Sequence, residues 1–379
     1  MSSLGLSTHL GRTIRQGPAA DLGRPTSELL FEALAADDTA AAAETLDYLF
    51  QERFIIRDLN SVFVWHLVHY VLERTDLTWA ELLEESIAPW VSATLGNAGA
   101  DAATVELGSG RTRLATAGTR WQVHVSEGDK RYHLSLGPPE EQLARWTQRK
   151  QQLIAAIGNR DRGTLDAALA EQSHEELVVH DIYGDWAWAL LSLAARRWGE
   201  ACLGDMLRVT QDPWLTPRYA AAAQMNAAQA LELAVEGMRG HFAGPGRQGE
   251  VSVVEEPSRY VMSFDACGSG GRMRRGDTVT GTGSRLDAPY HFLNVTEAYD
   301  FTWNRRGVCA YCAHCAVALQ LVPIERIGHP IRVTEYPDDA REPCRWIIYK
   351  QPELIPAHAY TEVGKEPPQR LAETRSVRG

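Results

Sequence analysis

The segment with the most closely spaced reactive side chains is Cys309-Ala-Tyr-Cys312-Ala-His-Cys315. Its three cysteines are each separated from the next by two residues. Two-residue gaps let successive thiolates turn towards one centre, as they do in zinc and iron–sulfur sites. Cys267 and Cys344 are candidates for the remaining position, because each adjoins a turn-forming glycine or proline. The alternative is that all five are reduced core cysteines, which pack as small apolar side chains. Five thiols in one window of the chain favour a metal site.

The preferred ligand set is Cys267, Cys312, Cys315 and Cys344, with Cys309 as an alternate ligand. Zinc is the expected metal, because a tetrahedral thiolate site needs no redox apparatus. An iron–sulfur cluster is the alternative cofactor. The centre is structural if all four positions are taken by the protein, and catalytic if one is left to water or substrate.

A glycine-rich loop with three arginines follows the first of these cysteines, Cys267-Gly-Ser-Gly-Gly-Arg272-Met-Arg274-Arg275. Glycines let backbone N–H groups converge on an anion, and arginine can bind a carboxylate through two hydrogen bonds. The loop lacks the Gly-Lys-Ser/Thr ending of a Walker A motif. We therefore expect Arg272 to orient a substrate, with further contacts from Ser269, Arg274 and His314. The alternative is a flexible turn with solvated arginines.

A histidine and two carboxylates, His180, Asp181 and Asp185, precede the apolar stretch from Trp186 to Ala195. A histidine beside a carboxylate can act as a general base or donate a metal ligand. His180 and Asp181 are thus candidate catalytic residues that handle protons. The alternative is that Asp185 caps a helix and Asp181 is an acid near its first turn.

Apolar residues at helical spacing predict the elements that position these side chains. Two helices are expected between Ser27 and Phe54, separated at Asp37-Asp38-Thr39, where Asp38 supplies an N-cap. Further helices are predicted over 62–74 and 79–90. Alternation then predicts a strand pair, 121–125 and 131–136, around a Glu-Gly-Asp turn.

A second helical block, residues 142–240, repeats the first at an almost constant shift. The matched pairs are Leu30 and Leu153, Ala33 and Ala156, Asp38 and Asp161, Leu46 and Leu169, Glu52 and Glu175, Asp58 and Asp181, Trp65 and Trp188, and finally Arg131-Tyr132 and Arg259-Tyr260. This order predicts an internal duplication of a helices-then-strands unit. The first copy has Arg57 in place of His180 and no cysteine cluster, so we expect only the second copy to be functional.

The predicted fold class is α+β, an internally duplicated unit of helices followed by an antiparallel sheet, whose second copy carries the Cys-rich metal site. The expected organisation is a flexible leader at 1–25, a degenerate first copy at 26–140, a helical region at 141–240, a Cys-rich metal or ligand domain at 241–352, and a tail at 353–379.

The composition of the chain argues against nucleic acid and membranes as binding partners. The chain has 379 residues, with 38 basic and 49 acidic side chains and a formal charge of −11, which argues against nucleic-acid binding. Its apolar stretches fall short of the roughly 20 residues that a bilayer span needs, and no signal peptide is evident. A cytoplasmic protein with reduced thiols, no nucleic-acid or membrane partner and a small-molecule substrate is expected.

Three C-terminal segments resemble the aminothiazoline-carboxylate hydrolase-like proteins, which are in turn similar to the small-molecule-binding domain named after vinyl reductases. They are Tyr311-Cys312-Ala-His-Cys315, Gly328-His-Pro-Ile-Arg-Val-Thr-Glu335 and Pro343-Cys344-Arg-Trp346-Ile-Ile-Tyr349, within residues 205–350. The loop and the Tyr-Cys-Ala-His-Cys segment also resemble those of certain bacterial proteins. The resemblance implies an antiparallel sheet flanked by helices, a homodimer in many members, and, in sensory relatives, zinc near positions like Cys315 and Cys344. This chain departs from them by carrying Tyr336-Pro337-Asp338 where a further cysteine is expected.

The first functional hypothesis is a zinc-dependent enzyme that acts on a small carboxylate-bearing metabolite by hydrolysis or lyase chemistry. Zinc would polarise a carbonyl or C=N group, or lower the pKa of a bound water to about 7. The second hypothesis is a small-molecule sensor with a structural zinc. The third is an iron–sulfur redox protein.

Overall fold

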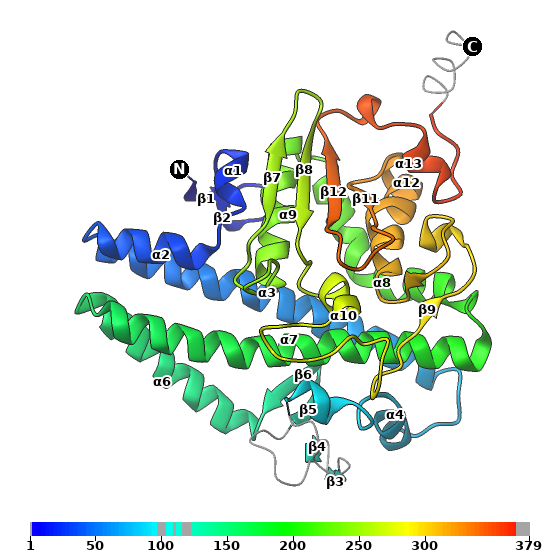
Figure 1. Ribbon diagram of the computed structural model, residues 1–379, viewed down its shortest axis with the longest axis horizontal. Coiled ribbons are helices and arrows are strands. Elements are labelled where there is room, and N and C mark those ends of the chain that lie inside the picture. Colours follow the sequence, from blue (N-terminus) through cyan, green and yellow to red (C-terminus); the bar gives the residue numbers. More distant parts are fainter. Residues whose placement is uncertain (1, 97–103, 109–110, 116–122, 369–379) are drawn as a thin grey trace.

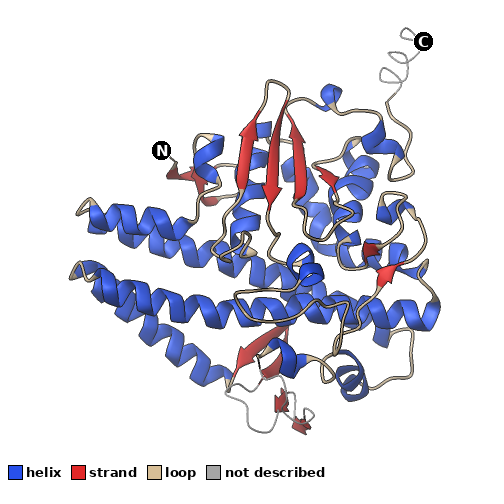
Figure 2. Cartoon of the chain, in the orientation of Figure 1, coloured by secondary structure: helices blue, strands red, loops and turns tan. Residues whose placement is uncertain are grey.

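The computed structural model describes residues 2–96, 104–108, 111–115 and 123–368, with side chains placed in all but the two short middle ranges. It is a mixed α+β structure in which helices dominate and the strands form several small antiparallel sheets. Figure 2 shows long helices through the middle of the molecule and strands on either side of them. This agrees with the predicted fold class at the level of α+β.

Two long helices, α3 (Thr39–Leu72) and α7 (Arg162–Trp198), pack against each other and carry the rest of the fold (Figure 1). Each follows a shorter helix, α2 (Thr26–Ala35) or α6 (Pro139–Gly158). The predicted separate helix at 62–74 is wrong, because α3 continues through it. No glycine or proline lies between residues 39 and 72 to end the helix. The helices α4 (Trp79–Ser86) and α5 (Val91–Thr94) follow.

The two long helices begin in the same way. The Asp38 side chain accepts a hydrogen bond from the Ala41 N–H at 2.9 Å, and the Asp161 side chain accepts one from the Thr164 N–H at 3.0 Å. The predicted N-cap at Asp38 is therefore confirmed.

The second half of α7 is almost completely buried, including Trp186 and Trp188. Asp181 and Asp185 lie inside this half, so the alternative that they cap or begin a helix is wrong. The helix starts some five turns earlier, because the apolar pattern extends back to Leu165. Within the described part of the chain, no helix combines the length and apolar character needed to cross a membrane.

One four-stranded antiparallel sheet packs on α3 and α7 in the order β3 (Thr104–Gly108), β4 (Arg111–Ala115), β5 (Val123–Gly128) and β6 (Arg131–Leu136). The predicted strand pair is confirmed by β5 and β6 where the structure describes it. Residues 121 and 122 of the predicted first strand lie outside the described residues.

The other four-stranded antiparallel sheet has the order β11 (Val333–Glu335), β12 (Cys344–Tyr349), β8 (Arg259–Phe264) and β7 (Ser252–Glu255). Helix α9 (Ala227–Gly240) contacts both this sheet and α3. Cys344 is in register with Phe264, the last residue of β8. This register brings Cys344 close to the loop that follows β8, which contains Cys267.

Shorter elements complete the second half. They are α8 (Cys202–Ala222), α10 (Gly270–Arg275), β9 (Asn294–Val295), η1 (Asp300–Thr302), β10 (Val308–Cys309), α11 (Ala313–Cys315), a π-helical turn η2 (Ala316–Leu321), α12 (Val322–Ile327), η3 (Pro352–Leu354) and α13 (His358–Thr361). The segment from α11 through η2 to α12 is continuous, so the cysteine motif lies at the start of one helical unit.

The expected flexible leader contains a folded hairpin, β1 (Ser3–Ser7) with β2 (Arg12–Gln16), followed by α1 (Ala19–Leu22). Arg15 is fully buried and donates to the Arg24 carbonyl at 2.7 Å, and Arg12 donates to Glu236 on α9 at 2.8 Å. Polar anchors therefore hold a segment that lacks an apolar block. Residues 353–368 of the predicted tail contain α13, and residues 369–379 lie outside the described part.

Candidate functional site

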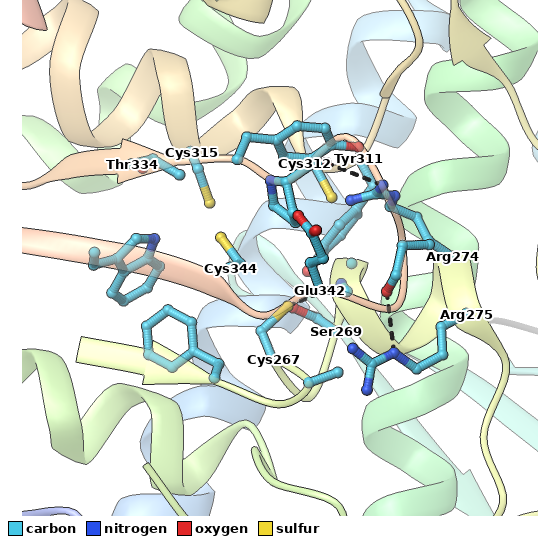
Figure 3. A pocket seen from close by; sticks show the side chains of 18 of the residues that line it. Cys267, Ser269, Arg274, Arg275, Tyr311, Cys312, Cys315, Thr334, Glu342 and Cys344 are labelled. Atoms are coloured by element: carbon cyan, nitrogen blue, oxygen red, sulfur yellow. Dashed lines mark hydrogen bonds between the residues drawn. The ribbon is translucent and has the colours of Figure 1, made fainter. Parts of the chain in front are cut away.

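Four thiols line one cavity, and they come from three separate segments of the chain. Cys267 follows β8, Cys312 precedes α11, Cys315 is the last residue of α11, and Cys344 begins β12. In Figure 3 the four side chains point into the space between these segments. The cavity has a volume of about 50 Å³. The preferred ligand set of the sequence analysis thus lines one cavity.

Cys309 does not belong to the cavity wall. It is completely buried in β10, and its thiol accepts a hydrogen bond from the Cys312 backbone N–H at 3.3 Å. Its own backbone N–H donates to the Tyr336 hydroxyl at 3.1 Å. Cys309 therefore supports the position of Cys312 from behind, outside the set that faces the cavity.

The glycines of the loop permit close packing around the cavity. A side chain on Gly270 would place its Cβ 2.4 Å from the Cys312 sulfur, and one on Gly268 would place it 1.4 Å from the His241 carbonyl oxygen. The Gly271 N–H donates to the Cys267 sulfur at 2.9 Å. The glycine run is therefore needed for close contact with a thiol and with the end of α9, where the sequence had suggested an anion cradle or a flexible turn.

Two arginines lie near the thiols and favour negative charge in the cavity. Removal from bulk water raises the pKa of the Cys315 and Cys344 thiols well above the usual value. Burial alone would lower the pKa of Arg274, but the neighbouring thiols, when ionised, raise it. Burial lowers the pKa of Arg332 to about 10, and Cys315 acts in the opposite direction. An anionic centre between the thiols would have both cations close to it.

The spacing of the thiols differs from that of a closed single-ion site. Tetrahedral zinc with Zn–S bonds of about 2.3 Å holds its sulfurs only about 3.8 Å apart. Among the residues that the structure describes, no three His, Cys, Asp or Glu side chains gather closely enough to hold one metal ion. The four cysteines thus line a common cavity without forming such a group.

His314 contributes an imidazole to the same cavity. Its Nδ1 lies 2.6 Å from the Tyr311 carbonyl oxygen, which fixes the proton on Nδ1. Its Nε2 lies 3.5 Å from the Cys315 sulfur. Ser269 and Arg274 also line the cavity, so three of the four expected substrate contacts share it with the thiols.

Arg272 lies elsewhere. It is only 3% exposed, and its guanidinium nitrogens lie 3.2 Å from Asp181 and from the Gly268 carbonyl oxygen. It does not line the thiol cavity. Arg272 is therefore neither a solvated loop residue nor a residue of the cavity wall, and its partner is a carboxylate of the protein itself.

His180 and Asp181 are buried side by side, with 3.0 Å between Nδ1 and Oδ1. Asp181 also accepts from Arg247 at 2.8 Å. Burial alone would raise the pKa of Asp181, but Arg247 and Arg272 hold it well below its usual range. Asp181 is thus an ionised partner of two arginines, and it orients His180 by accepting from Nδ1.

A second imidazole continues this arrangement towards the thiols. His180 Nε2 lies 3.0 Å from His241 Nδ1, and His241 lines the thiol cavity. Burial lowers the pKa of both histidines, so both are neutral near pH 7. The sequence showed His241 only as an isolated histidine, because its partner lies on another helix.

Further buried ion pairs escaped the sequence analysis. Asp185 is bound by Arg285 through two hydrogen bonds of 2.8 and 3.0 Å, and both side chains are fully buried. Arg247 also binds Asp277. These arginines lie in loops far along the chain from α7, and no local sequence motif predicts their partners.

No protein family, curated protein or solved structure matches the chain. The resemblance of the Cys-rich half to aminothiazoline-carboxylate hydrolase-like proteins therefore stays a prediction. The features of the molecule that bear on its function are the four thiols, the arginines beside them and the histidine pair.

Proposed function

We propose that this is an iron–sulfur protein in which Cys267, Cys312, Cys315 and Cys344 hold one cluster. The observation that carries the proposal is that four thiols from three segments surround one cavity without closing to single-ion spacing. Clusters of this type are commonly held by four thiolates. A multi-atom centre occupies a volume, and the cavity that the four thiols line has a volume of about 50 Å³.

The charges and packing of the wall support the same assignment. Four thiolates give the centre a net negative charge, which Arg274 and Arg332 are placed to offset. Phe264, Tyr311 and Trp346 supply apolar surface on the same wall. When bound, such a group supplies one-electron transfer or a Lewis-acidic iron. The chain's own part is to hold the group in a low-dielectric space and tune it with these cations.

The test is anaerobic reconstitution of the purified full chain with ferric iron, sulfide and a thiol reductant. We expect one cluster per chain by iron and acid-labile sulfide analysis, with broad visible absorption that bleaches on reduction with dithionite. Cys344→Ala should abolish it. Cys202→Ala is the matched control, because Cys202 lies on α8 and does not line the cavity. No iron uptake by the wild type, or full uptake by Cys344→Ala, would overturn the proposal.

A zinc-dependent enzyme acting on a small carboxylate-bearing metabolite, by hydrolysis or lyase chemistry, is the second candidate. It is favoured by His314, whose Nδ1 contacts a carbonyl while its Nε2 lies 3.5 Å from the Cys315 sulfur, on the side of the thiols. Imidazole ligands of zinc commonly have such a second contact. Arg274 on the same wall would then bind the carboxylate. Zinc in place of iron in the purified protein would select this candidate, and zinc with ligand binding but no turnover would indicate the sensor.

We also infer that the two halves are copies of one unit and that only the second holds the centre. Matching N-caps at Asp38 and Asp161 support this, as do the hairpins in which β6 and β8 begin with Arg-Tyr. The first copy carries Arg57-Asp58 where the second has His180-Asp181.

A further inference from the structure

A second cavity, of about 380 Å³, lies among α3, α6, α7 and the C-terminal end of α9. We call it the amphipathic cavity. Its volume falls in the usual range for sites that bind small organic molecules. Much of its wall is aromatic or aliphatic, from Phe50, Phe54, Trp146, Ile154 and Phe242.

The same wall carries three cationic side chains, and one of them has no carboxylate partner among the described residues. Arg53 pairs with Glu176 at 2.9 Å, and Lys150 pairs with Asp47 at 2.8 Å. The Arg57 guanidinium lies over the Trp146 ring, 4.7 Å from its centroid. In the described parts of the chain, no carboxylate lies within ion-pair distance of Arg57. A planar cation is thus held against an aromatic ring and has hydrogen-bond donors to offer.

We propose that the amphipathic cavity binds a small organic anion with an apolar, ring-sized body, such as an aromatic carboxylate. The Arg57 fork matches a carboxylate in shape and charge, and the aromatic wall matches the apolar body. His180 also lines the cavity, with its two ring nitrogens already bonded to Asp181 and His241. This inference is independent of the metal, because none of the four cavity cysteines contributes to the wall.

The position of His180 gives the cavity a connection to the thiol site. Its Nε2 contacts His241, and His241 lines the thiol cavity. A ligand in the amphipathic cavity is therefore separated from the thiol cavity by two hydrogen-bonded imidazoles.

The test compares 2-naphthoate with naphthalene-2-methanol, its neutral counterpart, by calorimetry and by quenching of tryptophan fluorescence. The wild type should bind the carboxylate about tenfold more tightly than the alcohol, since a charge-assisted hydrogen bond is worth about 1.5 kcal/mol or more. Arg57→Gln should remove this preference and leave alcohol binding unchanged. Arg162→Gln is the matched control, because Arg162 also lies over an aromatic ring, that of Phe31, but outside the cavity.

Two further variants decide where the probe sits. Thr147→Trp should fill the cavity and block both probes, since Thr147 lies on its wall. Binding that survives Thr147→Trp, or equal affinity of the wild type for both probes, would overturn the proposal. Phe54 is 61% exposed, and Phe54→Glu tests whether a second copy covers this face. A wild-type dimer that this variant converts to monomers, without 2-naphthoate binding, would also overturn it.

Discussion

Asp58 and Asp181 occupy matching positions of the two proposed copies, and their different burial predicts very different consequences for the same substitution. Asp181 is buried between His180, Arg247 and Arg272. Asp58 pairs with Arg131 at 2.6 Å, where the two side chains are 29% and 36% exposed. Replacing either by asparagine keeps the size of the side chain and removes its charge.

The expected losses in the free energy of unfolding follow from burial. Asp181→Asn leaves two buried guanidiniums short of a counter-charge, and removing one partner of a buried ion pair costs about 3–5 kcal/mol. Asp58→Asn removes a half-exposed pair, worth about 0–1 kcal/mol. The two variants should therefore differ by at least about 2 kcal/mol in urea unfolding near neutral pH.

The pH dependence supplies a second readout. The pKa of Asp181 is depressed in the folded protein, so its contribution to stability is complete above the unfolded-state value of about 3.9 and is lost as the pH falls through the folded pKa. The difference between wild type and Asp181→Asn should be constant from about pH 8 to 5 and shrink below about pH 4. Burial lowers the pKa of His180, so this residue stays neutral over the upper range. Equal losses for the two variants, or a difference that persists unchanged at about pH 3, would refute the reasoning.

Gly270→Ala should prevent cluster uptake, because its Cβ would lie 2.4 Å from a cavity sulfur. The control Gly237→Ala has no atom within 4 Å of the added Cβ, so it should retain full iron and stabilise α9 by about 0.5–1 kcal/mol. Cys309→Ser should keep the iron content of the wild type, because this thiol lies off the cavity wall; a loss matching that of Cys344→Ala would place it in the ligand set. Arg285→Lys should lower the free energy of unfolding by about 1–3 kcal/mol, because lysine cannot make both hydrogen bonds to its carboxylate, and an unchanged urea midpoint would contradict this.

Local spacing is the part of the site that sequence reasoning handles well. Cys312 and Cys315 share one short segment, so their proximity follows from the chain itself. Cys267 and Cys344 could be chosen only from the neighbouring glycine and proline. Their actual closeness depends on the register of β8 with β12, which pairs Phe264 with Cys344. Strand register is a tertiary property that a single sequence does not reveal.

The buried ion pairs could not be predicted from the local sequence. A loop of glycine and arginine is typical of a solvent-facing anion site, yet Arg272 turns inward to a helix that lies far away in the sequence. Asp181 and Asp185 look like helix-starting residues because aspartate is favoured there. They are tolerated in the middle of α7 because Arg247 and Arg285 neutralise them. The cost of burying a carboxylate is thus offset by residues that no local pattern identifies.

The buried polar residues of α7 make sense once the two cavities are considered together. A helix so completely enclosed would be most stable with apolar side chains throughout, because buried ion pairs seldom add net stability. His180 nevertheless lies between the amphipathic cavity and His241, which lines the thiol cavity. Asp181 fixes the hydrogen on His180 Nδ1 and so presents Nε2 to His241. The proposed first copy has Arg57 at the matching position, where it lines the amphipathic cavity from the opposite long helix. Under the proposed duplication, the divergence of the copies at this one position supplies the Arg57 cation and the imidazole of a single cavity.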